Sequence, residues 1–213
     1  MTIEPGYGET PLEPDEADAL TPQAREIFGG RPMKVELYEA EQAVSVEVGT
    51  AFLKDVVAGR LVLADLLSDV FVRTLHRALY GDLWTWAGRY RTRDLNIGVA
   101  PAHIAAELRG SLETIRYRWE NTDDWTPREL GIVVHAEAMR VHCFVDGNGR
   151  ATRLRADLVF LAAQDAEADV ETYDWAVDKR QYIALLRDYD MSRDPRLLAE
   201  FVPIRRVDEA EAL

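Results

Sequence analysis

The stretch VHCFVDGNGRATRLRADLVF, residues 141–160, places one histidine four residues before the pentapeptide Asp-Gly-Asn-Gly-Arg. A second arginine, Arg153, follows three residues after Arg150, and an apolar run comes next. A packed core needs neither paired glycines nor arginines one helical turn apart. The stretch therefore indicates a functional site, carried by the loop between two helices.

The backbone of this loop suggests an anion site. One helix is expected to end near Val141 and another to begin near Asn148. The first turn of a helix has free N–H groups and the positive end of the dipole, both of which favour a bound anion. Gly147 and Gly149 allow the backbone to approach a phosphate closely.

The side chains of the loop fit phosphoryl or nucleotidyl transfer. Arg150 and Arg153 would lie on nearly the same helix face, where two guanidinium groups can hold a polyphosphate. Asp146 supplies the hard oxygen ligand that a phosphate-bound Mg²⁺ requires. His142 is largely neutral at pH 7 and can take a proton from a hydroxyl.

The length, composition and charge of the whole chain limit the possible classes of protein. Its 213 residues, 47% of them hydrophobic, suit one sizeable globular domain. The formal net charge of −13 argues against direct nucleic-acid binding, because nucleic acid repels an acidic surface. The only cysteine is Cys143, which excludes an internal disulfide and a zinc site built from cysteines.

The N-terminus favours a cytoplasmic protein without a membrane partner. It is acidic and contains Pro and Gly, and it lacks the basic and apolar regions of a signal peptide. No apolar run approaches the length of a membrane span. Residues 1–30 are expected to form an arm, and residues 205–213 an acidic tail.

Helical periodicity dominates the rest of the chain and predicts a mostly α fold. Thr126-Pro127-Arg128-Glu129 is typical of a capping box, which would begin the helix that ends near Val141. Only residues 88–100 break the pattern, and they favour a loop or a small β-hairpin. Further helices are expected over 34–58, 66–80 and 101–121, from near Asn148 through Leu161, and after Asp178 and Pro195.

HCFVDGNGRATR resembles the signature of the Fic (Fido) family, H-P-F-x-[DE]-G-N-G-R-x-x-R. The matches fall at His142, Phe144, Asp146, Gly147, Asn148, Gly149, Arg150 and Arg153. LHRALYGDLWTWAGRYRTRDLNIG is similar to the stretch that leads into the β-hairpin flap of these proteins. The similarity covers roughly residues 60–200, with residues 60–204 taken as the Fic domain. ELYEAEQA and the acidic start most resemble the bacterial mobile mystery protein B subgroup.

The resemblance implies a Fic-type helical bundle with a small β-hairpin flap. It also implies an activity: transfer of AMP from ATP to a Ser, Thr or Tyr hydroxyl of a target protein, or of the protein itself. His142 would activate the hydroxyl, and Asp146 would hold Mg²⁺. The implied nucleotide-binding residues are Gly147, Asn148, Gly149, Arg150 and Arg153. Gly149, where the kinase-like branch has lysine, favours nucleotidyl transfer.

The resemblance also assigns expectations to neighbouring segments. Asp94, Leu95, Asn96 and Ile97 are the flap positions, which either meet the target backbone by strand addition or form a plain hairpin. The helix within residues 31–59 lies where an inhibitory helix would sit, although it lacks the full motif. Its candidate glutamates for pairing with Arg153 are Glu36, Glu39 and Glu41.

Other residues admit two interpretations. His135, seven residues before His142, is either a structural histidine or a metal ligand without a third partner. His76 and His103 are expected on helix surfaces. Trp84, Trp86 and Tyr90 would either stack on adenine or pack beneath the hairpin.

The reaction also has alternatives. The same pocket could remove AMP or transfer another phosphate-linked group. A different class is a low-turnover nucleotide-binding module of a toxin–antitoxin or mobile-element system, with an antitoxin or regulatory protein as its partner.

Overall fold

The computed structural model describes residues 12, 14–29, 32–165 and 169–207. Most of these residues lie in helices, so the prediction of a mostly α fold is confirmed. The helices are α1 (Pro14–Asp18), α2 (Pro22–Phe28), α3 (Lys34–Val57), α4 (Leu63–Leu66), α5 (Asp69–Tyr80), the 3₁₀ turn η1 (Pro101–His103), α6 (Ile104–Asn121), α7 (Pro127–Val141), α8 (Asn148–Ala163), α9 (Lys179–Ser192) and α10 (Arg196–Phe201).

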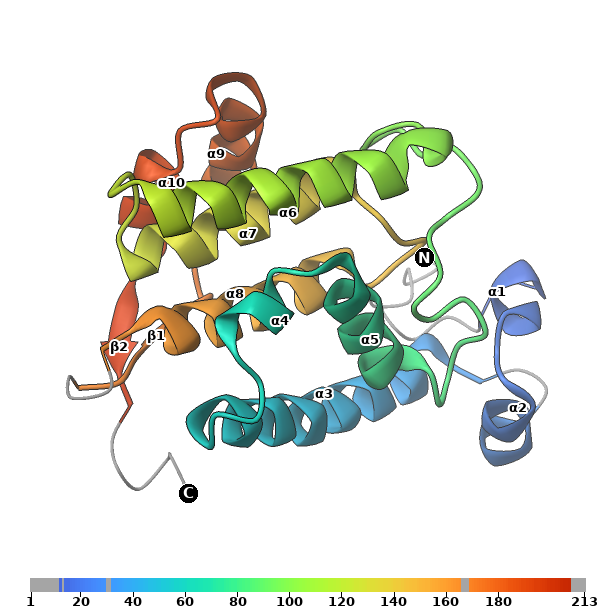
Figure 1. Ribbon diagram of the computed structural model, residues 1–213. Helices are drawn as coiled ribbons and strands as arrows, with labels where there is room; N and C mark the ends of the chain where they lie inside the picture. The colour runs from blue at the N-terminus through green and yellow to red at the C-terminus, as the bar shows by residue number, and fades with distance from the viewer. Residues whose placement is uncertain (1–11, 13, 30–31, 166–168, 208–213) are drawn as a thin grey trace, which may run out of the picture.

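Helices α7 and α8 form the centre of the molecule. The expected capping box begins α7: the Thr126 side chain accepts from the N–H of Glu129, whose carboxylate accepts from the N–H of Thr126. Every residue from 130 to 138 is buried. Helix α8 lies between α7 and α3, while α6 covers the other side of α7 (Figure 1). This antiparallel centre places the 142–147 loop at one end of the bundle.

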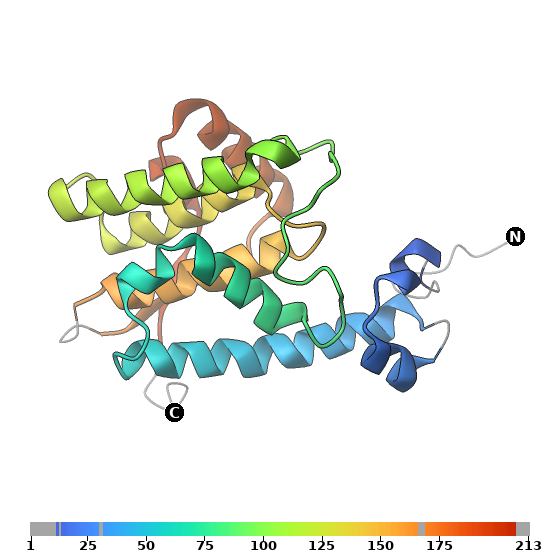
Figure 2. The same ribbon diagram turned by 45° about the vertical axis from the view of Figure 1, so that its right-hand side comes forward.

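The N-terminal helices pack against the segment that follows α5. Leu20 is buried and forms an isolated bridge with Trp84, and the N–H of Thr21 donates to the carbonyl of Leu83. Figure 2 shows α1 and α2 beside the N-terminal end of α3. Part of the expected arm, residues 1–11, 13 and 30, lies outside the described residues, as does 208–213 of the expected tail.

The described sheet is small and lies away from the expected flap. Strand β1 (Glu171–Tyr173) pairs antiparallel with β2 (Ile204–Arg206), with Thr172 opposite Arg205. Residues 89–100 form a loop without strand pairing, so the expected hairpin is absent from this segment. Two of its N–H groups, those of Arg91 and Val99, donate to the carbonyls of Cys143 and Val141, and the carbonyls of Arg93 and Val99 accept from the side chain of Arg91.

Among the described residues, no helix combines the length and the apolar character needed to cross a membrane.

Candidate functional site

His142 ends α7 in a strained conformation. Its φ of 52° and ψ of 67° are left-handed, a region that favours glycine, and its N–H donates to the carbonyl of Ala138 at 3.0 Å. Such strain persists only where surrounding contacts hold it. The chain therefore turns sharply at the very residue that the motif predicts to be catalytic.

The loop of residues 91–99, called here the 91–99 loop, supplies those contacts. The N–H of Arg91 donates to the carbonyl of Cys143 at 2.9 Å, and its Nε donates to that of His142 at 2.8 Å. The N–H of Val99 donates to the carbonyl of Val141 at 3.2 Å. A Cβ added to Gly98, whose φ is +85°, would lie 2.5 Å from the Cβ of His142. The loop thus fixes His142 from both sides.

The same surroundings keep the His142 imidazole neutral. Burial lowers its pKa below the usual value, and the nearby positive charge of Arg91 lowers it further. A neutral ring has one free nitrogen lone pair, so it can accept a proton near pH 7. Asp146 is close enough to act on this pKa in the opposite sense.

The turn into α8 is held together by Asn148. Its side chain is buried; its Oδ1 accepts from the N–H of Phe144 at 3.0 Å, and its Nδ2 donates to the carbonyl of Phe144 at 2.9 Å. Because the side chain is used in this way, a phosphate would meet only the backbone N–H of Asn148. Gly147 has a φ of 74°, and an added Cβ there would lie 2.5 Å from the Tyr80 ring. Glycine is therefore required at 147.

Gly149 differs from Gly147, because neither its backbone conformation nor its neighbours in the free protein demand glycine. It lies in the regular first turn of α8, and an added Cβ would meet only Nη1 of Arg153, at 3.7 Å. Its value is the open space it leaves above the turn, where a phosphate could approach the backbone.

The two motif arginines have different partners. Arg150 forms an ion pair with Glu41 of α3 at 2.6 Å, and its guanidinium lies over the Tyr80 ring at 5.2 Å. Glu41 is buried and also accepts from Nε1 of Trp84 at 2.6 Å. Of the three candidate inhibitory glutamates, Glu41 is therefore the one that meets a motif arginine, and that arginine is Arg150 rather than the expected Arg153.

The other two candidates face elsewhere. Glu36 accepts from the N–H of Met33 at 2.8 Å and so caps its own helix, and Glu39 is exposed. Arg153 lies near Tyr182 and His135. Burial raises the pKa of Tyr182, and the charge of Arg153 opposes this rise. Burial lowers the pKa of His135, and the charge of Arg153 lowers it further.

Asp146 fits a magnesium ligand that acts with a phosphate. It is exposed, and one of its carboxylate oxygens, Oδ1, accepts from the N–H of Gly147 at 2.6 Å. The described residues contain no group of three or more His, Cys, Asp or Glu side chains arranged to hold a metal. A lone carboxylate suits Mg²⁺ that keeps its waters and shares phosphate oxygens.

The expected flap residues lie in the 91–99 loop. Asp94, Asn96 and Ile97 are exposed, and Leu95 is half-buried. They are accessible, but no strand presents them.

Residues 66–160 match the Fic/DOC family model. The family resemblance of the motif is thereby confirmed for this segment, which includes α5, α6, α7 and most of α8. The match does not extend to a subgroup within the family.

The chain is also similar to a curated protein. Protein adenylyltransferase fic-1 of Caenorhabditis elegans is 29% identical over 102 residues, which cover 46% of this chain and 20% of the relative. The chain thus spans about a fifth of the length of this relative.

Solved Fic-domain structures share the fold. The BepC protein of Bartonella tribocorum, with bound AMPPNP, has a TM-score of 0.59 at 16% identity and covers 81% of this chain and 89% of its own. The N-terminal Fic domain of a cell filamentation protein from Bartonella quintana, with bound ADP, has a TM-score of 0.61 at 14% identity and covers 86% and 91%. At these identities the likeness establishes the fold.

Sequence reasoning missed the role of His76 within the Fic/DOC segment. This histidine was expected on a helix surface, but it is fully buried, so that expectation is wrong. Its ring bridges the N–H of Gly88 and the carbonyl of Asp146, each at 3.0 Å, and stacks on Phe144 at 3.6 Å. The spacing Val72–His76–Tyr80, which continues the buried side of α5, was the available signal.

Arg91 and Arg155 were also missed. Both are buried: Arg91 holds the 91–99 loop, and Arg155 donates twice to the carbonyl of Leu66. A buried arginine is uncommon, and only the position of Arg155 four residues after Ala151 hinted at burial.

Residues that admitted both a functional and a structural interpretation have structural roles. His135 is buried and bonds to the Tyr182 hydroxyl, without a metal-binding group around it among the described residues. Trp84 and Trp86 stack at 5.3 Å within the core. His103 is exposed as expected. Burial raises the pKa of the Cys143 thiol to about 12, so this thiol is a poor nucleophile.

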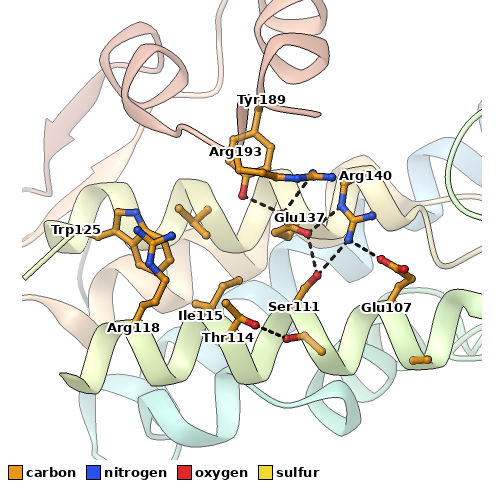
Figure 3. Close-up of a pocket in the computed structure, with 13 residues that line it drawn as sticks. Glu107, Ser111, Thr114, Ile115, Arg118, Trp125, Glu137, Arg140, Tyr189 and Arg193 are labelled. Atoms are coloured by element: carbon orange, nitrogen blue, oxygen red, sulfur yellow. Dashed lines mark hydrogen bonds and ion pairs between the residues drawn. The ribbon is translucent and has the colours of Figure 1, made fainter. Parts of the chain in front are cut away.

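A hollow of about 540 Å³, lined by both charged and apolar side chains, lies between α6, α7 and α9 (Figure 3). At its centre the buried Glu137 accepts from Ser111, Tyr189 and Arg140, and Arg140 also reaches Glu107. These bonds tie the last turns of α7 to α6 and α9. Since His142 directly follows the last residue of α7, the network supports the 142–147 loop from behind.

Proposed function

We propose that this protein transfers AMP from ATP to a hydroxyl side chain of a protein. The observation that carries the proposal is the 142–150 loop: it joins a neutral, rigidly held imidazole to a helix N-terminus flanked by two arginines. The Fic/DOC match and the bound AMPPNP and ADP of the two fold neighbours support a nucleotide as the ligand of this fold.

Each residue has a part in the proposed reaction. The backbone N–H groups of Asn148 and Gly149 bind the inner phosphates beside Gly147, whose own N–H donates to Asp146, and Arg150 and Arg153 bind the outer phosphates. His142 takes the proton of the incoming Ser, Thr or Tyr hydroxyl as it attacks the α-phosphorus and pyrophosphate leaves. Mg²⁺, held by Asp146, would neutralise phosphate charge.

The substrate side of the proposal rests on the 91–99 loop. Its exposed residues Asp94, Asn96 and Ile97, with Leu95, would pair with the backbone of the target, which would supply the strand partner that the free protein lacks. The proposal also retains three finer expectations from the sequence: the mobile mystery protein B subgroup, a cytoplasmic location, and an antitoxin or regulatory partner.

The decisive experiment is labelling with ATP that carries its label on the α-phosphate. We expect label on protein with the wild type, and a loss of roughly 10²- to 10⁴-fold in rate with His142→Ala, because general-base help is worth that much. His103→Ala, which changes an exposed histidine outside the site, is the matched control and should label normally.

The same experiment separates the competing functions. Nucleotide binding with no label on any protein would replace the enzyme with a nucleotide-binding module. Equal labelling by the wild type and His142→Ala would refute the assignment of His142 as the base.

A further inference from the structure

Helix α3 has a second apolar face that no other described element covers. Its inner face packs on the core through Ala40, Val48, Phe52 and Val56. On the opposite side Val35, Val46, Leu53 and Val57 remain 40%, 62%, 37% and 75% exposed. A helix at the surface usually presents polar residues on its outer side, so this apolar outer face requires an explanation.

The exposed residues form a straight stripe. Val35, Val46 and Val57 are spaced by eleven residues, which is close to three helical turns and keeps them in line. Gln42 and Leu53 repeat the same spacing beside them. Figures 1 and 2 both place α3 along one edge of the molecule, with α1 and α2 beside its N-terminal end.

We propose that this stripe binds the same stripe of a second copy of the chain, with the two α3 helices antiparallel and Val46 on the twofold axis. Val35 and Val57 are symmetric about that residue, whereas Leu53 lies opposite Glu39 of the second copy. Antiparallel pairing places Val35 opposite Val57 of the second copy, and Gln42 opposite its Thr50, where the side chains can hydrogen-bond. A twofold interface requires this kind of self-complementarity.

Charge selects the antiparallel arrangement. In it the exposed Glu39 lies beside Lys54 of the second copy, and this attractive pair occurs twice by symmetry. A parallel pair would instead place Glu39 beside Glu39 and Lys54 beside Lys54. Specific interfaces bury roughly 1,200–2,000 Å², and a contact confined to one helix pair is small by comparison, so we expect a weak dimer that forms at micromolar or higher concentration.

Site-directed crosslinking tests the geometry. In Val46→Cys the two introduced thiols meet at the axis, and we expect a disulfide-linked dimer under mild oxidation. Tyr117→Cys, an exposed position on α6, is the control and should remain monomeric. The native Cys143 is buried and contributes little background.

Charge reversal tests the orientation in sedimentation experiments over a range of concentrations. Glu39→Lys should weaken the dimer by roughly tenfold, because it turns two attractive exposed pairs into repulsive ones. Adding Lys54→Glu should restore it, whereas Glu113→Lys, an exposed charge reversal on α6, should have no effect. Val46→Lys should abolish the dimer.

These outcomes are decisive in both directions. A wild type that stays monomeric at the highest concentration, together with Val46→Cys that fails to crosslink, overturns the proposal and leaves the stripe to a different protein. A dimer that survives Val46→Lys lies at another surface and equally overturns it. The result is independent of nucleotide and of the proposed transfer reaction.

Discussion

His76 couples two segments that the proposed reaction needs. The N–H of Gly88 can only donate, so Nδ1 of His76 accepts and Nε2 carries the hydrogen that is donated to the carbonyl of Asp146. The ring also stacks on Phe144, the apolar residue that anchors the loop. The buried ring thus joins Gly88, just before the 91–99 loop, to the motif loop. His76 is therefore a positioning residue for both segments.

We therefore expect His76→Ala to reduce the free energy of unfolding by roughly 2–4 kcal/mol, through the lost packing and two unsatisfied main-chain groups. His76→Gln keeps a donor near Nε2, so it should recover nucleotide binding better than His76→Asn, which keeps only the acceptor near Nδ1. Urea unfolding and the KM for ATP measure the two effects. Equal KM values for Gln and Asn would mean that the bond to Asp146 does not position the loop.

At the level of whole elements, local sequence signals sufficed for the helices. The capping box at Thr126, the stop after Val57 and the start of α8 at Asn148 all follow from residues within one or two turns. The motif likewise marked its own loop, because glycines and arginines at fixed spacing have few other uses. These predictions needed no knowledge of distant contacts.

The contacts between elements could not be predicted in this way. The hairpin expected over 88–100 is a loop because Arg91 bonds to residues about fifty positions away, at His142 and Cys143. For the same reason, Glu41 was expected to pair with Arg153 but pairs with Arg150. Only the packing of α3 on α8 decides which guanidinium group Glu41 contacts. Sequence periodicity predicts which face of a helix is buried. Which residues pair between two helices depends on how the helices are aligned when they pack.

The link between α3 and α8 has a functional consequence if Arg150 binds ATP. Glu41 then competes with phosphate for the same guanidinium, so we propose that it restrains nucleotide binding. Glu41→Gln should retain the bond from Trp84 while removing the charge, and should tighten ATP binding by roughly tenfold, about 1.4 kcal/mol. Calorimetric titration with ATP and Mg²⁺ gives the comparison, with the exposed Glu39→Gln as control. Weaker binding by Glu41→Gln would show instead that Glu41 holds Arg150 in place.

Across the whole molecule, buried titratable groups make stability depend on pH in opposing ways. Burial lowers the pKa of His135 to about 3 and that of His76 to about 4, against an ordinary value of 6.5. Burial raises the pKa of Asp157 to about 7, even though bonds from Trp175 and Thr172 oppose the rise. The folded chain therefore excludes protons from two histidines and retains one on a carboxyl group.

These shifts fix the sign of each contribution. Below pH 6.5 the unfolded chain protonates both histidines and the folded chain does not, so each histidine costs up to about 1.4 kcal/mol of stability per pH unit, until its folded pKa is reached. Asp157 acts in the opposite direction: between pH 7 and 3.8 the folded chain holds a proton that the unfolded chain lacks, so acid favours the fold. In the wild type the two effects partly cancel.

Asp157→Asn removes the opposing contribution of Asp157 and should reveal how the two histidines make stability depend on pH. Asparagine keeps an oxygen that can accept from Nε1 of Trp175, but it binds no proton, so the free energy of unfolding should fall more steeply between pH 7 and pH 4 than in the wild type. Urea denaturation at half-unit pH intervals gives both curves. Asp123→Asn, which changes an exposed carboxylate, is the matched control and should follow the wild type. Curves for Asp157→Asn and the wild type that stay parallel through this range would mean that Asp157 is ionised in the folded protein and that its burial is compensated by its hydrogen bonds.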